Sequence, residues 1–253
     1  MVESGGRSEL DEPVEVVDLR ARSNAVRDLL DRAARDDDQS GDPRLVVGLS
    51  GMVEELQRLE PSAERSAWVM QPRYFYDPDE PGVELSRAAQ ARGVQTQLVV
   101  PPSTVQTHPL LPSIFPTTRL APVFIRAMVV DEQRMLVGGR DTADGQRTSW
   151  YTARPDVVAA MLDLWQRTLA LSTPILPPGT EPPLSLRQLE VARLMAVGEK
   201  DVSIARVLEL SPRTVEREVR AVLDELGARS RAEAVLLMGG RGVNGGWLSH
   251  GPG

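Results

Sequence analysis

Four charged side chains are spaced to lie on one face of a predicted helix that begins after Ser211. They are Arg213, Glu216, Arg217 and Arg220, so neighbours on that face are three or four residues apart. A guanidinium offers a fork of N–H donors that suits phosphate oxygens or a base edge, and a carboxylate can accept from the cytosine amino group. Exposed arginines on a helix are also commonly just a solvated face, so the surrounding elements have to decide.

Three serines mark where the supporting helices begin. Ser185 with Gln188 and Ser230 with Glu233 have the spacing of a capping box, in which side chains satisfy the first N–H groups of a helix. Ser211 precedes a proline, whose missing N–H costs nothing at the first helical position. Helices are therefore predicted to begin near residues 186, 212 and 231.

Two glycines and an apolar stripe complete a four-helix segment. Gly198 is predicted to end the first helix and Gly227 the third, and the second helix opens at Lys200 or Asp201. Apolar residues of the third helix recur at helical spacing and form one stripe for a small core. They are Val215, Val219, Val222, Leu223 and Leu226.

This segment resembles the LuxR/GerE-type helix-turn-helix. The matching residues are Arg-Gln-x-Glu-Val at 187–191, Ile204-Ala205, Ser211, Thr214-Val215, Leu226-Gly227 and Ser230-Arg231-x-Glu233-Ala234. The resemblance implies an all-α domain whose third helix lies in the major groove of double-stranded DNA.

The resemblance also implies roles for individual residues. Glu216, Arg217 and Arg220 would face base edges, whereas Ser211, Thr214, Arg213, Lys200 and Arg231 would lie near phosphates. Glutamates at 216, 218 and 225 depart from the family's usual lysine, histidine and lysine. Whether Glu216 specifies a base or repels phosphates stays open at this point.

Charge and composition limit the classes of function. Residues 184–241 hold ten basic and nine acidic side chains, whereas the chain as a whole has a net charge of −7. DNA binding is therefore expected to need the helix-turn-helix face, doubled in a homodimer. The absence of cysteine, of an apolar run near eighteen residues and of a secretion signal predicts a cytoplasmic protein without disulfides or membrane spans. No metal or cofactor is expected. Every basic residue except Lys200 is arginine, a bias that resembles proteins of actinomycetes.

Composition divides the chain into five segments. Residues 1–43 are acidic and predicted to be partly disordered, with a strand at 14–19 and a helix over 24–35. Residues 44–171 are predicted to form an α/β domain, 172–183 a linker with five prolines, 184–238 the helix-turn-helix, and 239–253 a flexible glycine-rich tail.

Apolar strands and helices alternate in the α/β segment. Strands are predicted at 45–49, 67–70 and 94–100, with helices over 52–59 and 83–92 between them, which favours a parallel sheet flanked by helices. Further strands are predicted at 119–122, 125–131, 134–137 and 148–152, followed by a helix over 155–171.

The stretch from Phe124 to Asp141 resembles the phospholipase D pattern His-x-Lys-x4-Asp-x6-Gly-Ser-x-Asn. Phe124 stands at the histidine, Arg126 at the lysine, and Asp131 and Gly138 match the pattern. A phenyl ring has no lone pair to attack phosphorus or carry a proton, so the family's reaction is excluded at this site. The histidines, His108 and His250, lie in a loop and in the tail, where a lone histidine is usually exposed.

Such a degenerate domain is similar to the effector domains of TrmB-like regulators, which implies an effector cleft at Phe124, Arg126 and Asp131. An anion held by Arg126 is the leading ligand. The alternative is structural: Asp131 caps the hairpin that ends at Arg134, and the glycines at 138 and 139 bend a strand.

The sequence therefore predicts a dimeric, DNA-binding transcription regulator with a non-enzymatic sensory domain. Two other classes are open. The acidic helix-turn-helix could dock on a protein such as RNA polymerase, and an unrecognised site could make the chain a phosphodiesterase.

Overall fold

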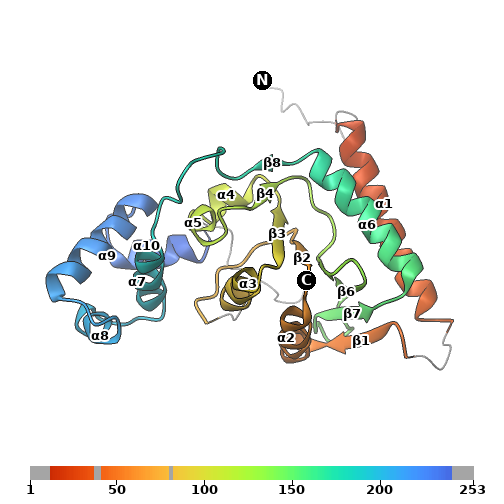
Figure 1. The fold of residues 1–253 in the computed structure, drawn as a ribbon, viewed down its shortest axis with the longest axis horizontal. Helices are drawn as coiled ribbons and strands as arrows, with labels where there is room; N and C mark the ends of the chain where they lie inside the picture. Colours follow the sequence, from red (N-terminus) through yellow and green to blue (C-terminus); the bar gives the residue numbers. More distant parts are fainter. Residues whose placement is uncertain (1–11, 37–40, 80–81, 241–253) are drawn as a thin grey trace, which may run out of the picture. The chain divides into compact units, whose positions relative to one another are not determined.

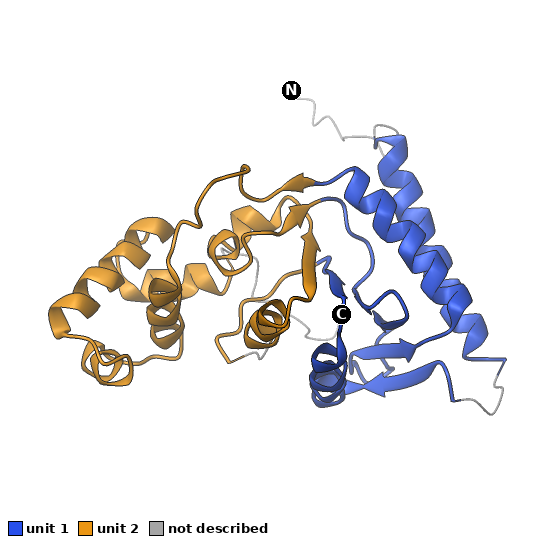
Figure 2. Ribbon diagram, viewed as in Figure 1, with its two compact units in different colours: residues 1–72, 121–172 blue, residues 73–120, 173–253 orange. Residues whose placement is uncertain are grey.

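The computed structural model of this chain describes residues 12–36, 41–79 and 82–240. The residue contacts divide it into two compact units, 1–72 with 121–172 and 73–120 with 173–253 (Figure 2). The segment 73–120 was expected in the α/β domain, and it clusters with the helix-turn-helix instead. The five segments expected from composition remain a prediction.

The first unit contains an antiparallel sheet. Its strands are β1 (Arg44–Val47), β7 (Thr148–Thr152), β6 (Arg134–Gly138), β5 (Ala127–Val130) and β2 (Ser66–Met70), in that spatial order. Every pairing among these strands is antiparallel. The expectation of a parallel core is therefore wrong for this unit. The reason is that β5, β6 and β7 follow one another through short connections, which favour antiparallel neighbours.

Two long helices lie side by side in this unit, α1 (Val14–Ala33) and α6 (Pro155–Ala170) (Figure 1). The predicted strand at 14–19 is wrong, because Leu19, Ser23, Val26 and Leu30 are buried at helical spacing on α1. Trp165 of α6 stacks on Trp68 of β2 with ring centroids 5.1 Å apart, which fixes the helix on the sheet. A shorter helix, α2 (Gly48–Leu59), follows β1 and continues into a 3₁₀ turn, η2 (Glu60–Ser62).

The second unit begins with α3 (Gly82–Ala91), β3 (Gln95–Val100) and β4 (Arg119–Leu120), with β3 and β4 parallel. Two short helices between them, α4 (Thr104–Thr107) and α5 (Leu111–Ile114), were not predicted. A short strand, β8 (Thr173–Pro174), pairs with β4 inside the predicted linker. The linker is thus tied to the second unit at its start.

Four helices complete the second unit: α7 (Leu186–Ala196), α8 (Asp201–Val207), α9 (Pro212–Leu226) and α10 (Arg231–Met238). Three of them begin at the predicted residues 186, 212 and 231. The expected tail from 241 onward, the expected disorder at 1–11 and His250 lie outside the described residues. No helix within the described ranges is long and apolar enough to cross a membrane.

Candidate nucleic-acid interface

The predicted serine caps are confirmed at all three helix starts. Ser185 Oγ accepts from the backbone N–H of Gln188, whose side chain accepts from the Ser185 N–H, so the box around α7 is complete. Ser230 Oγ accepts from the N–H of Glu233, but the Glu233 carboxylate accepts from Arg229 N–H at 2.8 Å rather than from the cap residue. Only half of that second box is therefore formed.

The turn geometry of the helix-turn-helix also follows the sequence. Ser211 Oγ accepts from Thr214 N–H at 3.2 Å, and Pro212 occupies the first position of α9. Gly227 ends α9 at φ 60° and Gly198 follows α7 at φ 87°, both left-handed. Between α8 and α9, Glu209 adopts φ 54°, a conformation that disfavours a residue with a Cβ.

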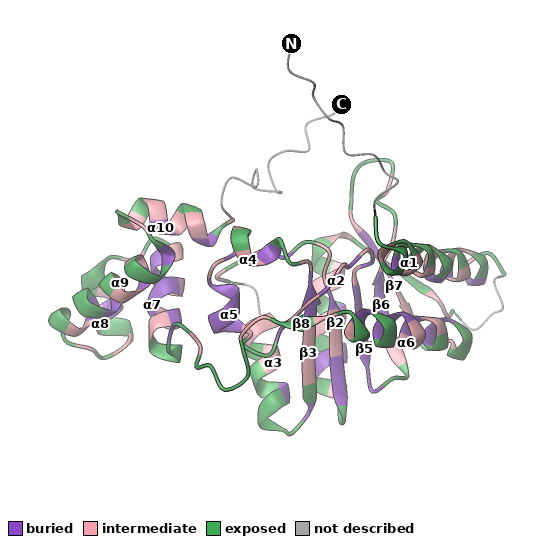
Figure 3. Ribbon diagram, turned by 90° about the horizontal axis from the view of Figure 1, so that it is seen from above, coloured by how far each residue is buried: buried purple, intermediate pink, exposed green. Residues whose placement is uncertain are grey.

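We define the charged face of α9 as Arg213, Glu216, Arg217 and Arg220. All four residues are exposed. The opposite side of the helix is buried at Val215, Glu218, Val222 and Leu226, and Figure 3 shows this change of exposure around α9. The helix therefore presents one continuous polar surface and keeps one side in the core.

Two of the three arginines of this face pair with a glutamate of the same helix. Arg217 donates to Glu218 Oε1 at 2.7 Å, whereas the Arg220–Glu216 ion pair spans 4.0 Å between side chains that are about three-quarters exposed. An exposed ion pair such as Arg220–Glu216 contributes about 0–1 kcal/mol to the stability of the protein. The positive charge of α9 is thus partly compensated by its own side chains.

The other predicted contact residues fall into two groups. Lys200 is exposed and immediately precedes α8, while Thr214 lies in the first turn of α9 with its hydroxyl 2.8 Å from Ser211 Oγ. Arg231 instead donates to Asp201 Oδ1 at 2.5 Å and to the carbonyl of Glu199. It ties α10 to the start of α8, a structural contact that the sequence did not predict.

The helix-turn-helix shares its hydrophobic core with residues of the preceding segment. Leu110 and Ile114, beside and within α5, are buried in the same cluster as Val191, Ile204 and Val215. The backbone N–H of Leu184 donates to Ser113 Oγ at 3.0 Å. One signal of this packing is present in the sequence, because Leu110, Leu111 and Ile114 are apolar residues close together in a proline-rich stretch.

The residues of the expected effector cleft are separated in the first unit. Phe124 and Arg126 precede β5, and Asp131 follows it. The Phe124 carbonyl accepts from Arg27 of α1, and the Arg20 guanidinium lies 4.4 Å from the Phe124 ring centroid. The Phe124 side chain is therefore engaged by α1.

Arg126 lies against the sheet rather than in an open cleft. Its guanidinium donates to Thr148 O at 3.1 Å and to Ser149 Oγ at 3.0 Å. Burial lowers the pKa of Arg126, Arg147 lowers it further, and Asp141 opposes the shift. A Cβ at Gly138 would come within 3.2 Å of Arg126 Nε, so the matched glycine makes room for this side chain.

Asp131 has a structural role, as the alternative reading of the sequence proposed. Its carboxylate accepts from the backbone N–H groups of Glu64, Arg65 and Ser66, with the shortest distance 2.8 Å. Burial raises its pKa, but these hydrogen bonds together with Arg134 outweigh burial, so the pKa is lowered overall. Asp131 thereby joins the β5–β6 turn to the start of β2.

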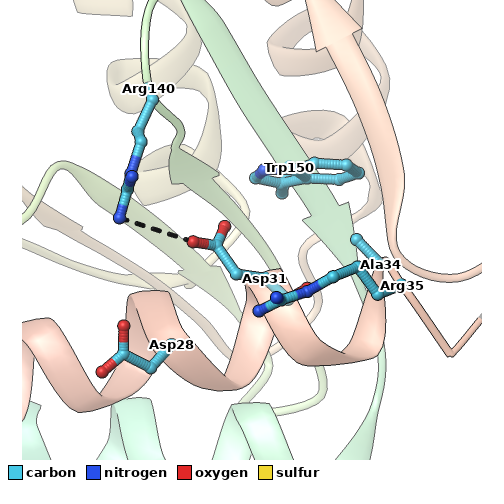
Figure 4. A pocket seen from close by; sticks show the side chains of 6 residues that line it. All are labelled: Asp28, Asp31, Ala34, Arg35, Arg140 and Trp150. Atoms are coloured by element: carbon cyan, nitrogen blue, oxygen red, sulfur yellow. Dashed lines mark hydrogen bonds and ion pairs between the residues drawn. The ribbon is translucent and has the colours of Figure 1, made fainter.

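The first unit carries a surface hollow of about 500 Å³ that the sequence did not reveal. It is lined by Asp28, Asp31, Ala34, Arg35, Arg140 and Trp150, from α1, β7 and the segment after β6 (Figure 4). Arg140 and Asp31 form an ion pair across it at 3.6 Å. Its residues are scattered along the chain without a motif, so no sequence pattern could have located it.

His108 is buried, so its expected exposure is wrong. Its ring meets Tyr74 edge to face at a centroid distance of 5.1 Å, and Nδ1 lies 2.8 Å from Thr107 Oγ1. The α4 turn, which was not predicted, places it there. Burial lowers the pKa of His108.

Comparison with solved structures found distant similarities. TrmBL2, an archaeal chromatin protein, is 15% identical, with 63% of this chain and 65% of that chain covered and a TM-score of 0.44. The match thus spans slightly less than two thirds of that protein. Nuc from Salmonella typhimurium, a phospholipase D family member, is 18% identical over 54% of this chain and 100% of its own, with a TM-score of 0.41. VqmA of Vibrio cholerae is 22% identical over 45% of this chain and 46% of its own, with a TM-score of 0.22.

Comparison by sequence gave a family for one part of the chain. The search of curated proteins found no match to this chain. A family model described as bacterial regulatory proteins, luxR family, matches residues 182–238, which contain helices α7 to α10 with the turns that join them. Residues 182–238 are a helix-turn-helix domain of the LuxR family of bacterial regulatory proteins.

Proposed function

We propose that this chain is a sequence-specific DNA-binding transcription regulator that acts as a homodimer. One observation carries the proposal. All four residues of the charged face of α9 are exposed, while the other side of the helix is buried in a core. In this proposal Glu216, Arg217 and Arg220 meet base edges, and Ser211, Arg213, Thr214 and Lys200 lie toward phosphates. A dimer is needed because one weakly charged helix offers few phosphate contacts.

DNA selected by the full-length protein from a random library tests this function. The selected duplex should bind at least about a thousandfold more tightly than random duplex, within the range of specific DNA-binding proteins. Its two half-sites should be about 10 base pairs or a multiple apart, as two-fold symmetry requires. Equal affinity for selected and random DNA would favour the rival function, docking on a protein such as RNA polymerase.

We further propose that the chain does not hydrolyse phosphodiesters. Phe124 supplies neither a nucleophile nor a proton carrier, and Arg126 is held by Thr148 and Ser149. Purified protein should leave a generic phosphodiester unchanged. Asp131 is unsuitable for testing residual activity, because its loss would disturb the fold, so the informative substitution is Arg126→Ala.

An effector role for the first unit is a second proposal, carried by the hollow beside Trp150. Its volume lies within the usual range for small-molecule sites, and its lining combines an aromatic ring with charges of both signs. Thermal shift with small anions, phosphorylated sugars among them, should find a stabiliser whose effect is lost in Trp150→Ala. If the stabilising effect is instead kept in Trp150→Ala and lost in Arg126→Ala, the compound binds at the anion site that was expected from the sequence.

A further inference from the structure

One arginine of the charged face of α9 is held by a buried carboxylate. Glu218 Oε1 accepts from Arg217 at 2.7 Å, and the Glu218 side chain is only 7% exposed while Arg217 is 70% exposed. The pair thus joins the interior of the domain to its proposed DNA-facing surface. The neighbouring Glu216–Arg220 pair is exposed on both sides and lacks this anchor.

Glu218 is itself fixed from a second helix. The hydrogen bond from Arg217 lowers its pKa most, burial opposes this, and the Gln188 side chain and the charge of Arg187 lower it further. The carboxylate is therefore ionised at neutral pH. Gln188 is in turn part of the capping box at the start of α7, where it accepts from Ser185 N–H at 2.8 Å. Arg217 is consequently held by a carboxylate that is buried in the domain.

We propose that Glu218 is a positioning residue that fixes Arg217 for a two-donor contact with guanine, so that Arg217 and Glu218 together set one base of the recognised sequence. The inference rests on the proposed DNA-binding function. A guanidinium has five N–H donors, and a carboxylate that holds one nitrogen still leaves a fork for O6 and N7 of guanine. Adenine offers an amino donor instead of O6 and would oppose one arm of the fork.

Physical costs also favour this arrangement over an unattached arginine. A side chain that is already held loses less conformational freedom when it binds. The glutamate also cancels much of the attraction of Arg217 for phosphates, which are the same in every sequence. Both effects increase the difference between the correct base and the others rather than the affinity for all DNA.

The test uses the full-length chain and the duplex that it selects from a random library. Each base of the selected half-site is replaced in turn, and the dissociation constants are compared. The wild type should prefer guanine at one position by about tenfold or more. Arg217→Ala removes the fork and should abolish that preference. Glu218→Gln keeps a hydrogen-bonding group without the charge and should reduce it severalfold, while preferences at other positions stay unchanged.

Glu225→Gln is the matched control, because it removes an exposed glutamate of the same helix that lies outside the charged face and should leave the guanine preference intact. The inference is overturned if Glu218→Gln tightens binding to every sequence equally, since Glu218 would then only withhold Arg217 from DNA. It is also overturned if Arg217→Ala retains the guanine preference, a measurement that stands even if Glu218→Gln does not fold. Selection of no sequence at all would instead refute the proposed function.

Discussion

Ser113 and Leu184 are joined by a hydrogen bond in which the Leu184 N–H donates to Ser113 Oγ at 3.0 Å. Both residues are buried, and they lie 71 positions apart in the chain. The bond fixes the entry of α7 on α5, next to the shared core of Leu110 and Ile114. The LuxR-family domain is therefore built on the segment 73–120, and the proline-rich stretch before it is not the sole connection.

Replacement of Ser113 by alanine should weaken this attachment. The substitution leaves the buried Leu184 N–H without a partner, which costs about 1–3 kcal/mol of unfolding free energy. Urea denaturation of the full-length protein measures it. Ser103→Ala, at an exposed site before α4, is the control and should change stability by less than about 0.5 kcal/mol. Equal stability of both variants would show that α7 does not depend on this bond.

The helix-turn-helix could be predicted from the sequence almost to the residue. Its signals are local, because a serine cap, a proline at the first position and a glycine at the end act within one turn of the helix. Ser185, Ser211 and Ser230 accordingly mark the observed helix starts. The exposure of the charged face of α9 follows from the same periodicity.

The remaining structure depends on contacts between distant residues. Sheet direction is decided by which strands meet, and the sequence order of strands and helices at 45–100 did not show that β1 pairs with β7 and β2 with β5. Arg231 was expected to meet phosphate because nothing local shows that Asp201, 30 residues earlier, takes its guanidinium. The buried Glu218–Arg217 pair likewise depends on how α9 packs against α7.

Asp131→Asn should destabilise the protein and change its response to acid. The carboxylate accepts three backbone N–H groups, so the amide should cost about 1–3 kcal/mol at pH 7. Because the folded pKa of Asp131 is lowered, its contribution is complete above the unfolded value of about 3.8 and is lost as pH falls through the folded pKa. The difference between wild type and variant, measured by urea denaturation, should therefore shrink below pH 4. A difference that is constant down to pH 3 would contradict this role.

Burial of His108 predicts a second pH dependence in a different window. Its pKa is lowered in the folded protein, so the unfolded chain binds more protons below the unfolded value of 6.5. Stability should be complete above pH 6.5 and decline as pH falls from 6.5 toward the lowered folded pKa. His108→Gln should flatten that slope in a thermal melt, even if it lowers the melting temperature at pH 7. An unchanged slope would mean that folding does not lower the pKa of His108.

Gly227 should be needed for its backbone conformation alone. It ends α9 at φ 60°, and a Cβ placed on it would meet no atom within 4 Å. Gly227→Ala should therefore cost about 1–2 kcal/mol without any steric clash. Gly139→Ala is a contrasting variant, since its Cβ would approach Thr148 Oγ1 and force a rearrangement of the sheet. Chemical denaturation should detect a loss in both, and a neutral Gly227→Ala would contradict the backbone argument.

Comparing the substitutions of Arg231 and Arg213 distinguishes a structural arginine from one that binds DNA. Arg231 holds Asp201 and the Glu199 carbonyl, so Arg231→Ala should lower the unfolding free energy by about 1 kcal/mol. Arg213 is exposed in the first turn of α9, and its loss should leave stability within about 0.5 kcal/mol. If Arg213 contacts a phosphate, Arg213→Ala should reduce the salt dependence of DNA binding by about one unit of slope, equally for all sequences. If Arg231→Ala reduces the salt dependence of DNA binding and leaves stability unchanged, Arg231 contacts a phosphate. Its contacts with the start of α8 would then be replaced by a contact with DNA.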